Sequence, residues 1–273
     1  METAARVGDA QEARWLCQRA AGRDTTEWAL GLDDRVTQRA MAHLDAMLAR
    51  RATGEPLQYV LGGWGFRTLD LFVDRRVLIP RPETEQVVEV ALALVRRRPR
   101  PWLAADLGTG SGAIALALAA ELPIGSVEVW ATDVSPDALA VARANLAGLG
   151  RPAAAVRIAE GSWFEALPAD LEGRFDLLVS NPPYVAAHEV LPEEVAAWEP
   201  RDALVSGPTG FEAVEVLVGG ATRWLAPGGW LVVEIGATQG PGARARAESA
   251  DLADVDVLAD AAGRDRVLVA RRP

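Results

Sequence analysis

The sequence predicts an α/β protein with a mostly parallel central sheet, a C-terminal antiparallel hairpin and a small helical region at the N-terminus. From residue 102 onward, short apolar runs alternate with helix-like segments, which is the pattern of right-handed βαβ crossovers. Residues 254–272 hold two apolar runs joined by AAGRD, a connection long enough for a hairpin. Residues 1–53 instead place apolar side chains at helical spacing.

The N-terminal part of the chain is predicted to form two units. Residues 1–53 are expected to fold as a helical domain, because their large apolar residues recur at helical spacing. These residues are Trp15, Leu16, Trp28, Leu32, Met41, Leu44, Met47 and Leu48. Residues 54–85 are rich in glycine and then alternate apolar with polar residues, as at Leu69, Leu71 and Val73. This second unit is therefore expected to be a linker that runs into a β-hairpin.

The remaining residues, 86–273, are expected to form the α/β domain. A helix is predicted in VLIPRPETEQVVEVALALVRRR, because two prolines precede an acidic first turn and arginines follow the last turn. The predicted strands are 102–107, 126–134, 154–161, 175–181 and 230–236, then 254–260 and 266–272 for the hairpin. The predicted helices are 112–122, 135–150 and 212–226.

Composition narrows the class of protein. The net charge of the chain is −10, which disfavours electrostatic binding to the phosphate backbone of long nucleic acids. No specific nucleic acid partner is therefore expected. Cys17 is the only cysteine and the two histidines, His43 and His188, are distant in sequence, so neither a disulfide nor a metal site is expected. The apolar runs are shorter than the roughly 20 residues of a membrane span. We therefore expect a cytoplasmic protein with no membrane partner.

A glycine-rich turn follows the first strand of the α/β region. In DLGTGSGA, Asp106 ends the strand, and Gly108, Gly110 and Gly112 lead into a helix. Glycines let the backbone approach a ligand closely, and the start of the helix offers free N–H groups. The spacing also fits a dinucleotide-binding loop, and a tight turn without a ligand stays open at this point.

Two further motifs end strands of the same region. Asp133, in ATDVS, ends the second strand, where a carboxylate can accept both hydroxyls of a ribose. SNPPYV ends the fourth strand with two prolines, which cannot donate backbone hydrogen bonds and make the backbone stiff. In a doubly wound sheet the first and fourth strands flank the crevice where ligands bind. The glycine turn and the residues from Asn181 to Tyr184 should therefore face each other.

DLGTGSG, TDVS, SWF and NPPY, in this order, resemble a class I methyltransferase that uses S-adenosyl-L-methionine to methylate planar nitrogens. With GEPLQYVLG, LIPRPETE and WEPRDALVSGPTG, the chain resembles the release factor glutamine methyltransferases, the PrmC/HemK family. The resemblance implies a Rossmann-like methyltransferase sheet and a helical domain that docks the substrate. It also implies that the enzyme forms N(5)-methylglutamine in the GGQ motif of class I peptide chain release factors. The release factor would be free or associated with the ribosome.

The same resemblance implies roles for individual residues. The cofactor-binding set would be Gly108, Thr109, Gly110, Ser111, Gly112, Asp133, Trp163 and Asn181, with Asp133 at the ribose and Trp163 at the adenine. The substrate-binding set would be Asn181, Pro182, Pro183 and Tyr184. Ser162 departs from the acidic residue found before the tryptophan in many relatives, so a secondary contact near the adenine is in doubt.

The chemistry of an amide explains why a site would use such residues. An amide nitrogen is a poor nucleophile, so help must be positional and electrostatic. The Asn181 side-chain oxygen and the Pro182 carbonyl can accept the two amide N–H bonds and stabilise positive charge that develops on nitrogen. Tyr184 can pack on the flat amide and exclude water. Asn181, Pro182 and Tyr184 are therefore the predicted catalytic residues.

Other polar residues have two interpretations. Arg81, Glu83 and Glu85 either shape a lid over the substrate or form an exposed capping turn. Glu199 either supports the substrate side or ends a helix. Glu234 is expected to be a structural or supporting carboxylate, and His188 a loop residue.

Alternative functions also stay open. One is glutamine methylation of a ribosomal protein. Another is methylation of adenine N(6) in nucleic acid, which would require a basic channel and aromatic side chains for base flipping. A nicotinamide-dependent oxidoreductase would explain the glycine turn but not NPPY. An inactive binding module is the last alternative.

Overall fold

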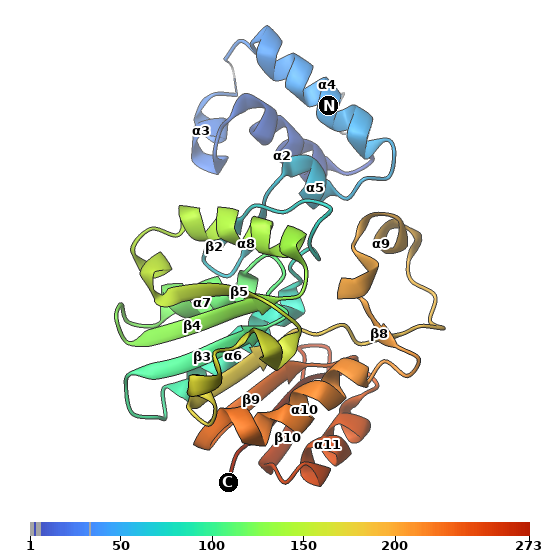
Figure 1. Cartoon of the computed structure of the whole chain (residues 1–273). Coiled ribbons are helices and arrows are strands. Elements are labelled where there is room, and N and C mark those ends of the chain that lie inside the picture. The colour runs from blue at the N-terminus through green and yellow to red at the C-terminus, as the bar shows by residue number, and fades with distance from the viewer. Residues whose placement is uncertain (1–2, 4–6, 33) are drawn as a thin grey trace.

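The computed structural model describes residues 3, 7–32 and 34–273. In Figure 1 a group of N-terminal helices lies at one end of a larger α/β body. The helices are α2 (Ala10–Ala21), α3 (Thr25–Leu30), α4 (Gln38–Arg51) and α5 (Leu57–Leu61).

Helices α2, α3 and α4 begin at side-chain caps, and α2, α4 and α5 share one small core. Asp9, Asp24 and Thr37 each accept a hydrogen bond from a backbone N–H in the first turn of α2, α3 and α4. The core comprises Leu16, Leu44, Met47, Leu48, Leu57 and Val60. Helix α5 therefore packs with the helical region, although it lies in the segment expected to be linker.

A β-hairpin connects this region to the α/β body. Its strands, β1 (Trp64–Phe66) and β2 (Leu69–Leu71), pair antiparallel. Its turn is tied to helix α6 (Pro82–Val95), because the Arg67 backbone N–H donates to Glu85 Oε1 at 2.8 Å. Proline in the first turn of α6 fits there, since that N–H has no partner within a helix.

The central sheet has seven strands in the order β10-β11-β9-β6-β3-β4-β5. They are β3 (Trp102–Leu107), β4 (Val127–Asp133), β5 (Val156–Glu160), β6 (Phe175–Ser180), β9 (Leu225–Glu234), β10 (Ala253–Ala259) and β11 (Asp265–Arg271). β3, β4, β5, β6 and β9 are parallel, and β11 runs antiparallel to β9 and β10. The predicted parallel sheet with a C-terminal antiparallel hairpin is confirmed.

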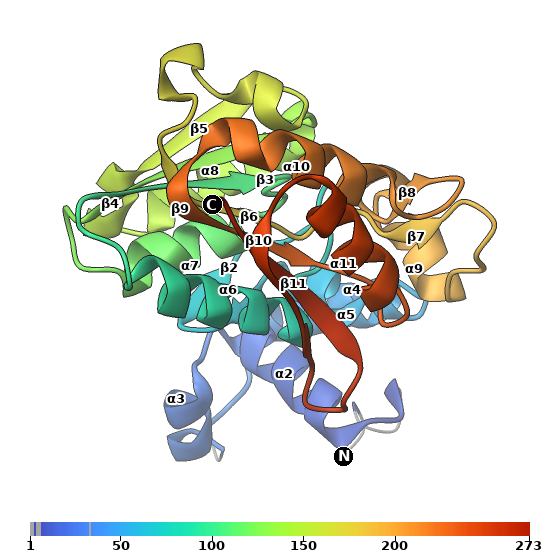
Figure 2. The same cartoon turned by 90° about the horizontal axis from the view of Figure 1, so that it is seen from below.

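Helices cover both faces of this sheet, as Figure 2 shows. Along β9, Val232 joins the core beneath α6 and α7 (Ala113–Glu121), whereas Leu231 and Val233 join the core beneath α10 (Glu212–Trp224) and α11 (Gly240–Ser249). Successive residues of a strand point to opposite faces, so a sheet buried on both sides reads as a continuous apolar run. Helix α8 (Pro136–Gly148) packs against β4 and β5.

Several short elements lie outside the sequence prediction. Helix α11 is one of them, because its first turn contains Gly240, Pro241 and Gly242 and its buried face carries only small side chains. The others are α9 (Glu193–Trp198), the parallel pair β7 (Val185–Ala186) and β8 (Val205–Gly207), and the 3₁₀ turns Arg151–Ala155, Trp163–Ala166, Ala169–Leu171 and Arg201–Ala203. Among the described residues, no helix combines the length and apolar character needed to cross a membrane.

Candidate active site

A cavity of about 500 Å³ lies at the carboxyl ends of β3, β4 and β6. Its wall combines segments that are far apart in the chain. Its lining includes Pro80, Thr84, Gly108, Thr109, Gly110, Ser111, Asp133, Ser162, Trp163, Asn181, Pro183, Pro200 and Asp202. A volume of this size is typical of sites for small molecules and cofactors.

The glycine turn forms one wall of this cavity. Gly108, Gly110 and Gly112 have φ values of +78°, +55° and +87°, a region that residues with a Cβ rarely adopt. The backbone N–H groups of Gly108 and Thr109 donate to the Thr132 carbonyl at 2.9 and 2.8 Å. These bonds hold the turn open toward the cavity. Gly112 is not among the lining residues and instead caps the start of α7.

Asp106 supports the turn from within the protein. Its fully buried Oδ2 accepts hydrogen bonds from Thr109 Oγ1 at 2.6 Å and from the Ala115 N–H at 3.1 Å, while Oδ1 has no partner among the residues that the structure describes. Burial raises the pKa of this carboxyl to about 7, against the hydrogen bonds that lower it. Sequence reasoning assigned Asp106 no role in the site. The sequence signal that could identify it is an acidic residue near the end of an otherwise apolar strand.

Asp133 joins the glycine turn to the end of β4. Its Oδ2 accepts from the Gly110 N–H and its Oδ1 from the Ser135 N–H, each at 2.9 Å. Burial raises the pKa of Asp133, and these backbone N–H groups lower it in part. The side chain lines the cavity. Two predicted cofactor motifs are thus connected by a direct hydrogen bond.

Trp163 lies across the glycine turn. Its φ is positive (48°), which is uncommon for a residue other than glycine, and a Cβ on Gly108 would lie 3.5 Å from its ring. Strained backbone of this kind is often found at functional sites. Ser162, the departure noted in the sequence, precedes it in the cavity wall.

The NPPY motif reaches the same cavity from β6, which pairs with β3. Asn181 and Pro183 line the cavity, whereas Pro182 is buried and Tyr184 lies half-buried behind them. Asn181 Nδ2 donates to Thr84 Oγ1 at 3.1 Å. The structure therefore brings the glycine turn and NPPY together, with Pro182 and Tyr184 outside the lining set.

Glu234 lies behind this motif and is 1% exposed. It accepts hydrogen bonds from Thr84 Oγ1 at 2.7 Å and from the Tyr184 hydroxyl at 3.4 Å. Burial is the main reason that its pKa rises to about 7. Burial, followed by the charge of Glu234, raises the pKa of Tyr184 to about 12.

The segment before α6 is held against the segment after α9. Arg81 forms an ion pair with Glu199, whose side chain is 2% exposed and also accepts the Ile79 N–H at 3.1 Å. This pair fixes the rim where Pro80 and Pro200 line the cavity. Glu199 therefore both ends helix α9 and supports the rim.

The other polar candidates lie outside the cavity wall. Glu83 lies 3.8 Å from Arg264, and Glu85 holds the hairpin turn through Arg67. His188 is an exposed loop residue.

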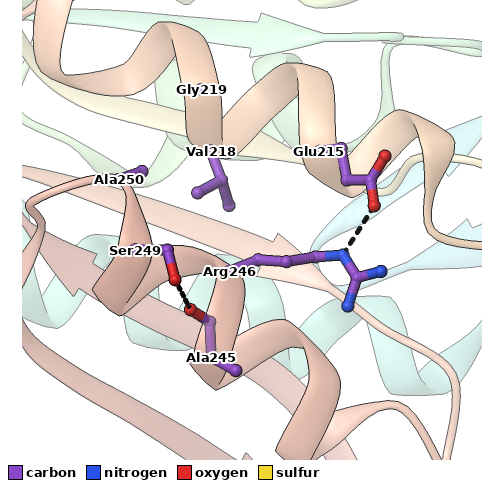
Figure 3. A pocket seen from close by; sticks show the side chains of 7 residues that line it. All are labelled: Glu215, Val218, Gly219, Ala245, Arg246, Ser249 and Ala250. Atoms are coloured by element: carbon purple, nitrogen blue, oxygen red, sulfur yellow. Dashed lines mark hydrogen bonds and ion pairs between the residues drawn. The ribbon is translucent and has the colours of Figure 1, made fainter.

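A second cavity, of about 300 Å³, lies between α10 and α11 (Figure 3). Arg246 lines it, but its Nε donates to Glu215 Oε1 at 2.8 Å and its guanidinium lies 4.0 Å from the centre of the Phe211 ring. Ser249 Oγ donates to the Ala245 carbonyl at 2.8 Å. Because these polar groups are paired with the protein itself, the cavity beside Asp133 is the candidate active site.

Comparison with known proteins identifies the family of this chain. Residues 3–62 match the PrmC N-terminal domain, and residues 93–198 match the methyltransferase small domain. A release factor glutamine methyltransferase of Cereibacter sphaeroides is 43% identical over 97% of this chain and 91% of its own length. One of Burkholderia pseudomallei is 41% identical over 97% of this chain and 93% of its own length.

Solved structures agree with this assignment at the level of the fold. A methyltransferase from Pyrococcus furiosus aligns with a TM-score of 0.54 at 18% identity, covering 84% of this chain and 98% of that one. A ribosomal protein L11 methylase from Lactobacillus delbrueckii subsp. bulgaricus aligns with a TM-score of 0.51 at 21% identity, covering 72% and 82%. Given relatives of such identity along nearly the whole sequence, the chain belongs to the release factor glutamine methyltransferase family.

Proposed function

We propose that this protein transfers a methyl group from S-adenosyl-L-methionine to the side-chain amide nitrogen of the glutamine in the GGQ motif of peptide chain release factors. One observation carries the proposal. The glycine turn, Asp133 and Asn181 line a single cavity in a chain that matches release factor glutamine methyltransferases along nearly its whole length.

The cavity wall fits the chemical groups of S-adenosyl-L-methionine. The Asp133 carboxylate is an acceptor for the ribose hydroxyls, and the glycine turn lets the ligand approach the backbone closely. Trp163 offers a flat ring in the same wall, suited to adenine. When bound, the cofactor supplies a methyl group on a positively charged sulfur.

Asn181 and Pro182 are proposed to hold the substrate amide. Because Asn181 Nδ2 donates to Thr84, Oδ1 is left to accept a substrate N–H. The Pro182 carbonyl would accept the second N–H, and Pro183 and Tyr184 would pack around the amide. As the N–C bond forms and the C–S bond breaks, both acceptors stabilise the charge on nitrogen, which then loses one proton to water.

The helical region is proposed to dock the release factor, which we expect this enzyme to meet in the cytoplasm, free or on the ribosome. Its core is separate from the cores on the two faces of the sheet. A docking surface of its own would leave the cavity free to receive the glutamine. The domain boundaries at residues 53 and 85 remain predictions.

The test is to incubate the protein with isotopically labelled S-adenosyl-L-methionine and a purified release factor, and to map the label by peptide mass spectrometry. We expect one methyl group on the GGQ glutamine and none when that glutamine is replaced by alanine. Ribosomal proteins and nucleic acid serve as competing substrates. Label on either of these, with none on the release factor, would overturn the proposal.

A further inference from the structure

Thr84 lies between the site residue Asn181 and the buried Glu234. It belongs to the first turn of α6, Asn181 follows β6, and Glu234 ends β9. Three separate elements thus form one chain of hydrogen bonds: Asn181 Nδ2 to Thr84 Oγ1 at 3.1 Å, and Thr84 Oγ1 to Glu234 Oε2 at 2.7 Å. Thr84 is 3% exposed, so water has little access to the central group.

The chemistry of these groups determines which group donates in each hydrogen bond of the series. When Glu234 is ionised, its carboxylate can only accept hydrogen bonds, so the single Thr84 hydroxyl proton then points to Glu234 at 2.7 Å. The Thr84 oxygen is then left as an acceptor toward Asn181, which must present its NH₂ group there. The Asn181 oxygen therefore faces away from Thr84. In the described part of the chain no donor reaches this oxygen.

We propose that Thr84 and Glu234 are positioning residues that fix the orientation of the Asn181 amide, so that its oxygen and not its nitrogen meets the substrate amide. This inference rests on the proposed function. It deepens that function because a reversed Asn181 would present donors to a substrate nitrogen that itself carries two N–H bonds. Neither Thr84 nor Glu234 touches the reacting atoms; both act through Asn181.

The groups around Glu234 preserve its acceptor role. The Tyr184 hydroxyl donates to its second oxygen, Oε1, so both carboxylate oxygens accept from the site. Burial disfavours the ionised form most strongly; the charge of Arg266 favours that form, and the charge of Glu83 disfavours it. Arg266 is itself held by the Ile235 carbonyl at 3.3 Å and lies 3.5 Å from Asp260. The carboxylate therefore has a fixed counter-charge nearby.

The decisive comparison is between Thr84→Val and Thr84→Ser. Valine keeps the shape of threonine but removes the hydroxyl, whereas serine keeps the hydroxyl. We expect Thr84→Val to lower kcat for the release factor by roughly ten- to a hundredfold, the range for a misaligned reacting group. The KM and the calorimetric Kd of the variant for S-adenosyl-L-methionine should stay near the wild-type values. Thr84→Ser should restore most of kcat.

Ser126→Ala is the matched control for loss of a buried hydroxyl. Ser126 is 7% exposed and its Oγ donates to the Pro123 carbonyl at 2.6 Å, in the loop between α7 and β4. This variant should keep wild-type kcat. Equal kcat for Thr84→Val and Ser126→Ala would overturn the inference, as would equal losses for Thr84→Val and Thr84→Ser.

Glu234→Gln provides a second measurement if Thr84→Val does not fold. Glutamine can donate as well as accept, so Thr84 is no longer forced to donate to it, and both orientations of Asn181 become available. We expect a lower kcat with unchanged cofactor affinity; unchanged kcat would overturn the inference. If wild-type protein does not methylate the release factor, the proposed function fails instead, so the two failures are distinguishable.

Discussion

The Gly110 backbone N–H donates a hydrogen bond of 2.9 Å to Oδ2 of Asp133, across a separation of 23 residues in the chain. The carboxylate thus holds the glycine turn directly. Its other oxygen is held by the Ser135 N–H. A ribose arriving in the cavity would meet an acceptor that is already oriented, which reduces the entropy lost on binding.

Asp133→Ala should therefore weaken cofactor binding more than it lowers turnover at saturating cofactor. Hydrogen bonds to a charged group contribute about 1.5–3 kcal/mol each, so we expect the Kd for S-adenosyl-L-methionine to rise by at least about tenfold. Isothermal titration calorimetry measures this change. Asp137→Ala, an exposed carboxylate on the first turn of α8, is the control. An unchanged Kd for Asp133→Ala would remove this residue from the site.

Asn181→Ala should mainly reduce turnover. The variant loses a preoriented acceptor for the substrate amide, a loss that typically costs about 10²- to 10³-fold in kcat. Cofactor affinity should fall much less. Single-turnover methylation of a release factor at saturating cofactor measures the effect. Near-normal turnover would contradict the role proposed for Asn181.

Gly112→Ala should destabilise the fold and the turn together. Gly112 has φ +87°, and a Cβ there would lie 3.1 Å from Leu116 Cδ1. Gly125→Ala is the matched control, because Gly125 has φ +77° and no atom of the described residues lies within 4 Å of its Cβ position. Left-handed backbone costs an alanine about 1–2 kcal/mol, so both variants lose that much and only Gly112→Ala loses more. Urea unfolding compares them; equal losses would exclude a crowding effect at Gly112.

The Arg81–Glu199 ion pair should stabilise the cavity rim. Arg81→Ala would leave Glu199 buried without its partner, a change that costs about 3 kcal/mol or more of unfolding free energy. The double variant Arg81→Met, Glu199→Leu should lose less than Arg81→Ala alone, because no unpaired charge remains. Chemical denaturation of both variants checks this order. The reverse order would show that the pair itself, rather than the unpaired charge, determines stability.

Glu234 should make stability depend on pH. Its pKa rises from an ordinary 4.5 to about 7 on folding, so between these values the folded state binds more protons than the unfolded state. The unfolding free energy contributed by Glu234 therefore falls as pH increases through this window. Glu234→Gln removes this dependence, so the variant should gain stability relative to wild type between about pH 5 and pH 8. Urea unfolding across this range measures the difference; a constant difference would mean that the pKa is not raised.

Much of the fold could be predicted because its signals are local. The apolar run Trp102–Leu107 and the glycines that follow it identify a strand and a tight turn without reference to any distant residue. The sequence gives no signal for helix α11, because its buried positions, such as Ala243 and Ala247, carry side chains too small to produce an apolar period. Helix α5 falls in the predicted linker, because it has only five residues and is stabilised by packing on α2 and α4.

The candidate site likewise has some features that local sequence predicts and others that depend on tertiary packing. The strands of the central sheet, the glycine turn and the NPPY motif can be recognised from the sequence alone, since apolar periodicity, glycine and proline act on their own neighbourhood. The polar groups that support them depend on how distant segments pack together. Thr84 meets Glu234 across 150 residues, and Arg81 meets Glu199 across 118. Such partners are set by how α6 packs on the sheet, because a buried polar group must find its hydrogen bond wherever the folded chain provides one.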